Sequence, residues 1–187
     1  MNNPEDTLIK RQFPYIGDVS HELYNLPGTY IGPTNNEVPN ADGGIPQTDV
    51  RYYVEMDDGT IQVIDIEDET SNVDQATLKK VYRYKTNLVY GHKKPVISVI
   101  STTLPIKKCS TKLEYSQTDF LIPIMKSLPL EDAWERLNML LDKIKKQEMF
   151  SNIEALELIT HPRKCTKNQD IATEKICNSP NELICCM

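Results

Sequence analysis

The residues best suited to chemistry are the carboxylates of the run Ile-Asp-Ile-Glu-Asp-Glu, which starts at Ile64. Side chains alternate along a strand, so Asp65, Glu67 and Glu69 share one face. Ile64 and Ile66 then face a core on the other side. Three carboxylates on one face repel one another unless solvent, a lysine or a divalent cation compensates them. Mg²⁺ binds one or two carboxylates with water and substrate phosphate, so a metal site is one way to compensate the run. A solvated acidic strand end is the alternative.

A β-hairpin is predicted to position these carboxylates. Residues 49–56 favour a strand, Asp57-Asp58-Gly59-Thr60 is a turn sequence, and residues 61–67 are rich in β-branched side chains. The pair Asp58-Gly59 favours the positive φ angles of a tight turn, so the two strands should be antiparallel neighbours. Upstream, residues 23–31 can form a first strand or a turn of helix.

A helix, a buried strand and further helices should follow. The helix ends at Gly91, and its apolar face has spacings of three and four, with Val73, Thr77, Val81, Tyr84 and Leu88. The apolar run 96–101 predicts a strand covered on both faces and reached by a crossover connection. Residues 120–125 should be extended but interrupted by proline. A helix after Pro129, with Ala133, Leu137, Leu140, Leu141 and Ile144 on one face, and a short helix at 152–160 complete the expected elements.

Composition places the chain among globular proteins. It has 187 residues, of which 39% are hydrophobic and 26% charged, as expected for one domain. The net charge, 21 minus 27 or −6, means that any nucleic acid must bind at a local basic surface. No run approaches the roughly 18–20 apolar residues of a spanning helix, and the first residues lack a signal-peptide layout. We therefore expect a cytoplasmic protein without a membrane anchor, with its five cysteines reduced.

The motifs and their order resemble the PD-(D/E)XK nuclease superfamily. The resemblance rests on Thr48-Asp49-Val50, the run IDIEDET, the helical segment ATLKKVYRYKTNLVY and the segment KKPVISVISTT. It covers residues 20–160 and is most similar to the transposase-like, recombination-promoting branch and its archaeal and bacterial relatives. It implies an α/β fold with a restriction-endonuclease-like αβββαβ core, a mixed central sheet and C-terminal helices.

The resemblance also assigns roles to single residues. Asp49 matches the motif Asp and Glu67 the motif Glu, which together ligate the metal, Mg²⁺ or Mn²⁺. Glu69 stands where the family has Lys or Gln, and it becomes the third catalytic candidate, as a further ligand or a water-orienting base. Glu37 stands about where the family often has an additional acid. An alternative register takes Asp65 and Glu67 as the acidic pair.

A basic helix follows the acidic strand. Gln75, Lys79 and Arg83 are four residues apart and form one stripe, so with Lys80 they are candidates to bind nucleic-acid phosphates. A solvated helix face is the alternative. Lys79 or Lys80 is also the candidate to replace, in space, the lysine missing at position 69. The resemblance implies DNA as the partner, and a homodimer, because cutting two strands takes two sites.

Three functional hypotheses follow. The first is a metal-dependent DNA endonuclease, in which a metal held by Asp49 and Glu67 polarises the scissile phosphate. The second is a catalytically degenerate nuclease fold that acts as a nucleic-acid-binding or protein-interaction module. The third is a small globular protein without nuclease ancestry, in which the acidic strand end lies at the surface. In the nuclease hypotheses, residues 1–163 form a single PD-(D/E)XK-like domain and residues 164–187 a polar, Cys-bearing tail.

Overall fold

The computed structural model describes residues 17–34, 50–69, 72–116 and 120–165. The chain divides into two compact units, residues 1–127 and residues 128–187. Within the described residues, no helix is both long enough and apolar enough to cross a membrane. Asp49, Glu37 and the predicted tail from residue 166 onward lie outside these ranges.

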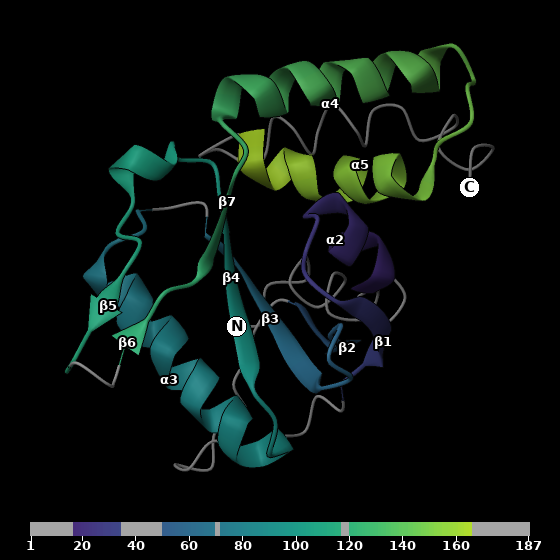
Figure 1. Ribbon diagram of the computed structural model, residues 1–187. Helices are drawn as coiled ribbons and strands as arrows, with labels where there is room; N and C mark the ends of the chain where they lie inside the picture. Colours follow the sequence, from purple (N-terminus) through teal and green to yellow (C-terminus); the bar gives the residue numbers. More distant parts are fainter. Residues whose placement is uncertain (1–16, 35–49, 70–71, 117–119, 166–187) are drawn as a thin grey trace, which may run out of the picture. The chain divides into compact units, whose positions relative to one another are not determined.

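The first unit is a mixed sheet with helices (Figure 1). Its elements in chain order are α2 (Gly17–Leu23), β1 (Thr29–Pro33), β2 (Val50–Glu55), β3 (Ile61–Glu69), α3 (Gln75–His92), β4 (Val96–Thr102), the 3-10 helix η2 (Ile106–Lys108), β5 (Leu113–Glu114), β6 (Phe120–Leu121) and β7 (Ile124–Ser127). The strand order is β1-β2-β3-β4-β7, with antiparallel pairs up to β3 and parallel pairs from β3 to β7. The predicted αβββαβ order and mixed sheet are confirmed.

The predicted hairpin is formed by β2 and β3. Its register runs from Val50 opposite Ile66 to Glu55 opposite Ile61. The amide of Met56 donates to the carbonyl oxygen of Thr60 at 2.9 Å, so three residues, 57–59, form the loop. Only Gly59 in this loop has a positive φ, +77°, which glycine adopts without a steric penalty. The loop is therefore one residue longer than a tight turn centred on Asp58-Gly59.

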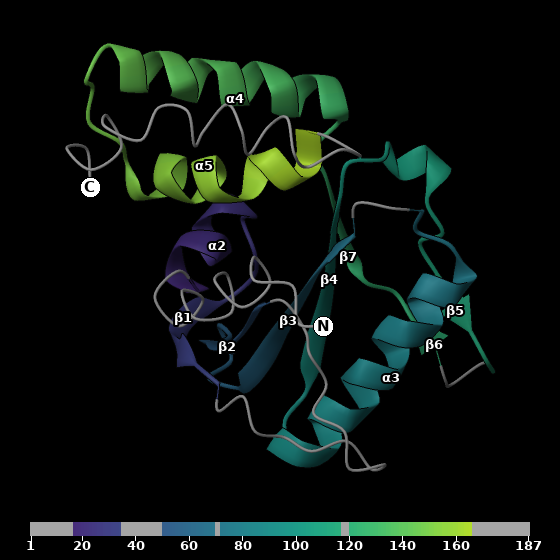
Figure 2. The same ribbon diagram turned by 180° about the vertical axis from the view of Figure 1, so that it is seen from behind.

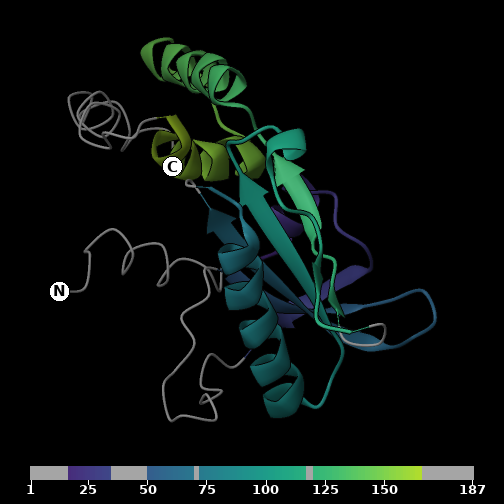
Figure 3. The same ribbon diagram turned by 90° about the vertical axis from the view of Figure 1, so that its left-hand side faces the viewer.

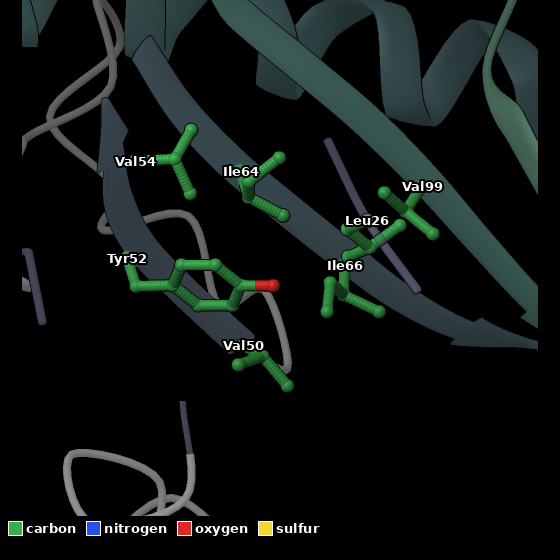
Figure 4. Packing of buried hydrophobic residues seen from close by; sticks show 7 residues of the cluster. All are labelled: Leu26, Val50, Tyr52, Val54, Ile64, Ile66 and Val99. Carbon is green, nitrogen blue, oxygen red and sulfur yellow. The ribbon is translucent and has the colours of Figure 1, made fainter. Parts of the chain in front are cut away.

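One face of the sheet is apolar. Figure 4 shows its packed side chains, which are Leu26, Val50, Tyr52, Val54, Ile64, Ile66 and Val99. Ile64 and Ile66 of β3 are at most 1% exposed, and this confirms that they face a core. Leu26 reaches the sheet from the turn after α2. Gly28 in that turn has φ +84°, and a Cβ there would lie 2.8 Å from the carbonyl oxygen of Glu55. The turn therefore requires glycine.

Helix α3 connects β3 to the parallel strand β4 and packs on the other face of the sheet (Figures 2 and 3). Its buried residues are Leu78, Val81 and Leu88. The carboxylate of Asp74 caps its first turn by accepting from the amides of Ala76 and Thr77. The helix ends at His92 and Lys93 adopts the left-handed conformation, φ 51°, so the predicted end at Gly91 is wrong by one residue. Gly91 stays helical because the capping bond from Lys93 to Val89 forms beyond it.

Strand β4 is central, between β3 and β7, as the apolar run predicted. A mixed sheet lacking this strand beside the hairpin would have supported the third hypothesis, and the structure does not have that arrangement. Pro123 separates β6 from β7, as expected for a residue that cannot donate to a ladder. The β5–β6 pair adjoins α3, and Leu113 and Leu121 join the core beneath that helix.

The second unit contains the helices α4 (Leu130–Lys145) and α5 (Asn152–Cys165), which pack together. The predicted apolar face of α4 is confirmed, since its buried residues are Ala133, Leu137, Leu140 and Ile144, with Leu141 partly buried. Helix α5 continues past the predicted end at residue 160 and through Pro162. A proline costs a helix one hydrogen bond and steric strain, and the helix is formed in spite of that cost.

Candidate active site

Glu67 lies on β3 against helix α3. It is 3% exposed, and its Cα pairs with that of Ile100 in the parallel strand β4. Alternation along β3 places Asp65 and Glu69 on the same face, away from the apolar cluster. Burial disfavours a carboxylate's charged form, so each needs a cation or hydrogen-bond donors. The shared face agrees with the prediction.

Lys80 of α3 supplies that cation for two of the three carboxylates. Its Nζ lies 3.1 Å from Glu67 Oε2 and 2.6 Å from Glu69 Oε1, and its side chain is 39% exposed. Burial by itself lowers the pKa of the ammonium, but the hydrogen bond to Glu69 and the charge of Glu67 outweigh burial and raise the pKa above its ordinary value. Lys80 therefore stays protonated at neutral pH. It bridges the two carboxylates.

Arg51 of β2 compensates the third carboxylate. Its Cα pairs with that of Asp65, and its Nε lies 3.6 Å from Asp65 Oδ1. The side chains are 4% and 0% exposed, so this ion pair is fully buried. Burial lowers the pKa of the guanidinium, while the charges of Asp65 and Glu67 oppose that shift. Arginine remains charged under such conditions because its ordinary pKa is so high.

These five residues, Arg51, Asp65, Glu67, Glu69 and Lys80, form what we term the sheet charge cluster. Three carboxylates and two cations leave one net negative charge within it. The alternative of a solvated acidic strand end is wrong for Asp65 and Glu67, because both are buried. Buried charge of this kind is characteristic of functional sites, although ion-pair networks also occur in purely structural roles.

The carboxylates of β3 do not make a metal site by themselves. In residues 17–34, 50–69, 72–116 and 120–165, no three His, Cys, Asp or Glu side chains converge on one point. Lys80 engages Glu67 Oε2, so a cation at that oxygen would have to share it with the ammonium. The other predicted ligand, Asp49, directly precedes Val50 in the sequence and lies outside the described residues.

The predicted basic stripe divides into two parts. Lys79 and Arg83 are exposed and line an open groove of about 550 Å³ on α3, together with Lys80. Gln75 instead donates from Nε2 to the carbonyl oxygen of Lys112 at 3.1 Å, so it fixes the segment before β5. The structure therefore brings Lys79, Lys80 and Arg83 together at one surface.

Two groups at this site were missed by reasoning from the sequence. Arg51 was not singled out, because a tight turn centred on Asp58-Gly59 would have placed it opposite Ile66 and not opposite Asp65. Tyr115 also lines the groove, and no sequence signal connected this distant residue with α3. Tyr82 is half-buried and lies beside Tyr115 with ring centroids 5.1 Å apart.

Comparisons with known proteins add little to this geometry. No family model and no curated protein matches the chain. A search of solved structures found the small subunit of the heterodimeric restriction endonuclease R.BspD6I, at 12% identity and a TM-score of 0.31, over 94% of this chain and 95% of that one. A TM-score this low does not assign a fold. The fold class stands on the order and pairing of the elements described above.

Proposed function

We propose that the protein is a metal-dependent nuclease of the PD-(D/E)XK superfamily, in its transposase-like branch, that hydrolyses phosphodiester bonds in DNA. Support comes from the αβββαβ order of the first unit, with the motif residue Glu67 on the central strand pair β3–β4. A carboxylate buried beside a lysine at the end of a sheet suits a reaction that develops negative charge on a phosphate.

The Glu67–Lys80 contact carries the proposal. The family pattern places a lysine on the strand two residues after the motif Glu, where this chain has Glu69. Lys80 approaches the same carboxylate from helix α3, with Nζ 3.1 Å from Glu67 Oε2. Because its pKa is raised, Lys80 acts as a fixed positive charge for the scissile phosphate and not as a general base. Glu69 holds that ammonium through its 2.6 Å contact.

The metal in this proposal is Mg²⁺ or Mn²⁺, held by Asp49 and Glu67. When bound, such an ion polarises the phosphate and lowers the pKa of a water molecule. Asp49 precedes Val50, and Val50 pairs with Ile66, the neighbour of Glu67. The proposal includes a homodimer, because double-strand cleavage takes two sites, and a cytoplasmic location.

Nicking of supercoiled plasmid by the purified protein tests the proposal. We expect cleavage with Mg²⁺ or Mn²⁺, its loss on chelation, and its loss in Asp49→Asn and Glu67→Gln. Lys80→Met should also abolish cleavage, whereas Lys85→Met, on the same helix but outside the groove, should retain it. Circular dichroism of each variant shows that the fold is kept. The proposal fails if the wild type does not cleave, or if cleavage survives both Asp49→Asn and Glu67→Gln.

A second candidate function is a nuclease fold that binds nucleic acid without cutting it. The observation that favours it is the pairing of both Glu67 and Glu69 with one lysine, which gives each carboxylate a cationic partner without a metal. Calorimetric titration of the protein with Mn²⁺ discriminates the two. Saturable binding that is lost in Glu67→Gln supports the nuclease, and nucleic-acid binding without any Mn²⁺ binding supports the module.

A further inference from the structure

The groove on α3 combines positive charge with aromatic rings. Its lining comprises Ala76, Lys79, Lys80, Tyr82, Arg83, Thr86 and Tyr115. The helical members recur at intervals of three and four residues, so they form one wall, and Tyr115, which follows strand β5, lies against Tyr82 of that wall. A wall of cations facing an aromatic ring is the arrangement that binds phosphates and stacks a base.

The cations of this wall are available to an anion. Lys80 is held by Glu67 and Glu69, but in the described part of the chain neither Lys79 nor Arg83 forms an ion pair with a carboxylate. Four residues of helix separate Lys79 from Arg83, which is about 6 Å along the helix axis. Arg83 lies over the ring of Tyr84 at 5.8 Å, a contact that leaves its charge in place. Since the whole chain carries a net charge of −6, two cations on one stripe without a carboxylate partner among the described residues are a local attraction for a polyanion.

Tyr115 offers a ring to the same ligand. It is 54% exposed, and its ring rests against that of Tyr82 at 54°. That contact holds the ring in place while leaving part of it open to solvent. The neighbouring carboxylate of Glu114 is paired with Lys112 at 3.2 Å, which reduces its repulsion of a phosphate.

We propose that this groove binds a single strand of nucleic acid, with a base stacked on Tyr115 and backbone phosphates held by Lys79 and Arg83. The inference rests on the proposed function, since it names the form of substrate that reaches the same site. Lys80 lines the groove and also contacts Glu67, so a strand lying there leads to the candidate active site. The bases of a duplex are stacked within it and cannot stack on Tyr115 without being unpaired.

Fluorescence anisotropy in the presence of a chelator tests this assignment apart from cleavage. The probes are a fluorescein-labelled oligothymidylate and the same strand annealed to its complement. We expect the single strand to bind more tightly than the duplex. Tyr115→Ala should weaken it roughly 5- to 100-fold, whereas Tyr115→Phe should retain the affinity because the ring remains. Tyr90→Ala is the control. Tyr90 lies on α3, is 83% exposed and does not line the groove, so its substitution should leave the affinity unchanged.

The salt dependence tests the phosphate contacts separately. Each contact with a single strand contributes about 0.7 to the slope of log K against log salt. Lys79→Ala and Arg83→Ala should therefore each reduce the slope by about 0.7, while Lys85→Ala on the same helix should leave it unchanged. Tyr115→Leu retains an apolar contact with Tyr82 without an aromatic ring, so it should bind as weakly as Tyr115→Ala if stacking is the cause.

Three results would overturn the assignment. They are tighter binding of the duplex, unchanged affinity in Tyr115→Ala and Tyr115→Leu, and salt slopes that do not respond to Lys79→Ala or Arg83→Ala. Binding without cleavage refutes the nuclease but not the groove. Metal-dependent nicking that persists while single-strand binding is absent refutes the groove but not the nuclease. The two proposals thus fail in distinguishable ways.

Discussion

The two units of this protein use the same ionic chemistry in different surroundings. In the sheet charge cluster, the side chains of Arg51 and Asp65 are 4% and 0% exposed. The helical charge cluster of the second unit comprises Arg136, Lys143, Glu154 and Glu157, and it joins α4 to α5. There Arg136 and Lys143 are 32% and 28% exposed. Solvent therefore reaches the two cations of the helical cluster, whose Glu154 and Glu157 are 17% and 12% exposed, whereas protein surrounds the Arg51–Asp65 pair.

Because of this difference in exposure, the two clusters contribute differently to the stability of the fold. Ion pairs near solvent typically stabilise by less than about 1 kcal/mol. A buried pair adds little net stability relative to apolar residues, but removing one partner is strongly unfavourable. An apolar pair could fill the position of Arg51 and Asp65 more simply, so stability alone does not account for a buried charge in the sheet.

The largest effect is expected for Arg51→Met. It leaves the buried carboxylate of Asp65 without its arginine and should lower the free energy of unfolding by about 3–5 kcal/mol. Urea denaturation followed by circular dichroism measures this change. The double variant Arg51→Met with Asp65→Leu should recover most of the loss. If the double variant is as unstable as the single one, the loss comes from packing and not from charge.

Lys80→Met should lower the free energy of unfolding by a smaller amount, about 1–2 kcal/mol, because the lysine is partly exposed. The contribution of Lys80 to stability should depend on pH. The pKa of Lys80 is raised in the folded state, so its contribution is complete below the ordinary value of 10.5 and is lost as the pH rises through the folded pKa. Urea titrations at increasing alkaline pH should therefore show a shrinking difference in the free energy of unfolding between wild type and Lys80→Met. A difference that is constant with pH would contradict this origin.

Glu154→Gln tests the helical cluster and should lower the free energy of unfolding by less than about 1 kcal/mol. The hydrogen bond from Lys143, followed by that from the Ser151 amide, lowers the pKa of Glu154 below its ordinary 4.5. Its contribution is present above that value and is lost as the pH falls through the folded pKa. Thermal unfolding between neutral and acidic pH should show the variant approaching the wild type in acid. The opposite trend would refute the assignment.

Lys145→Ala should have the smallest effect on the free energy of unfolding. Lys145 and Asp142 form an exposed pair on one turn of α4, with side chains 70% and 60% exposed and a contact of 2.9 Å. Solvent screens this pair, and alanine favours helix at least as well as lysine. The unfolding midpoint in urea should be unchanged within error. A clear loss would show that exposure is a poor guide to the strength of the ion pairs in this chain.

Most of the fold was predictable from the sequence because it depends on local patterns. The acidic run and the apolar run 96–101 gave β3 and β4, and helical spacing gave α3 and α4. The hairpin register was harder to predict. A tight turn centred on Asp58-Gly59 would pair Arg51 with Ile66, but the three-residue loop pairs it with Asp65. One added residue moves every cross-strand partner, which is why the role of Arg51 was missed.

The candidate site was predictable only in part. The choice of Glu67 and Glu69 followed from alternation along a strand, and Lys80 was one of two lysines proposed to act in space. Its place against the sheet had a signal, since it lies three residues after Thr77 and four before Tyr84, both half-buried. Tyr115 had none, because the β5–β6 pair reaches α3 through tertiary packing. Asp49 and Glu37 lie outside the described residues, so their roles stay predictions.

The parallel pairing of β3 with β4 has a consequence for the order of folding. The β2–β3 hairpin closes a loop of three residues, but β4 can join β3 only after the chain has formed the α3 crossover. The carboxylates of β3 therefore remain hydrated in an early hairpin and lose water when α3 docks, together with Lys80. We expect substitutions at Gly59 to slow refolding and Lys80→Met mainly to accelerate unfolding, as stopped-flow kinetics would measure. Helix α3 thus buries the carboxylates of β3 and also supplies Lys80, the cation that compensates the charge of Glu67 and Glu69.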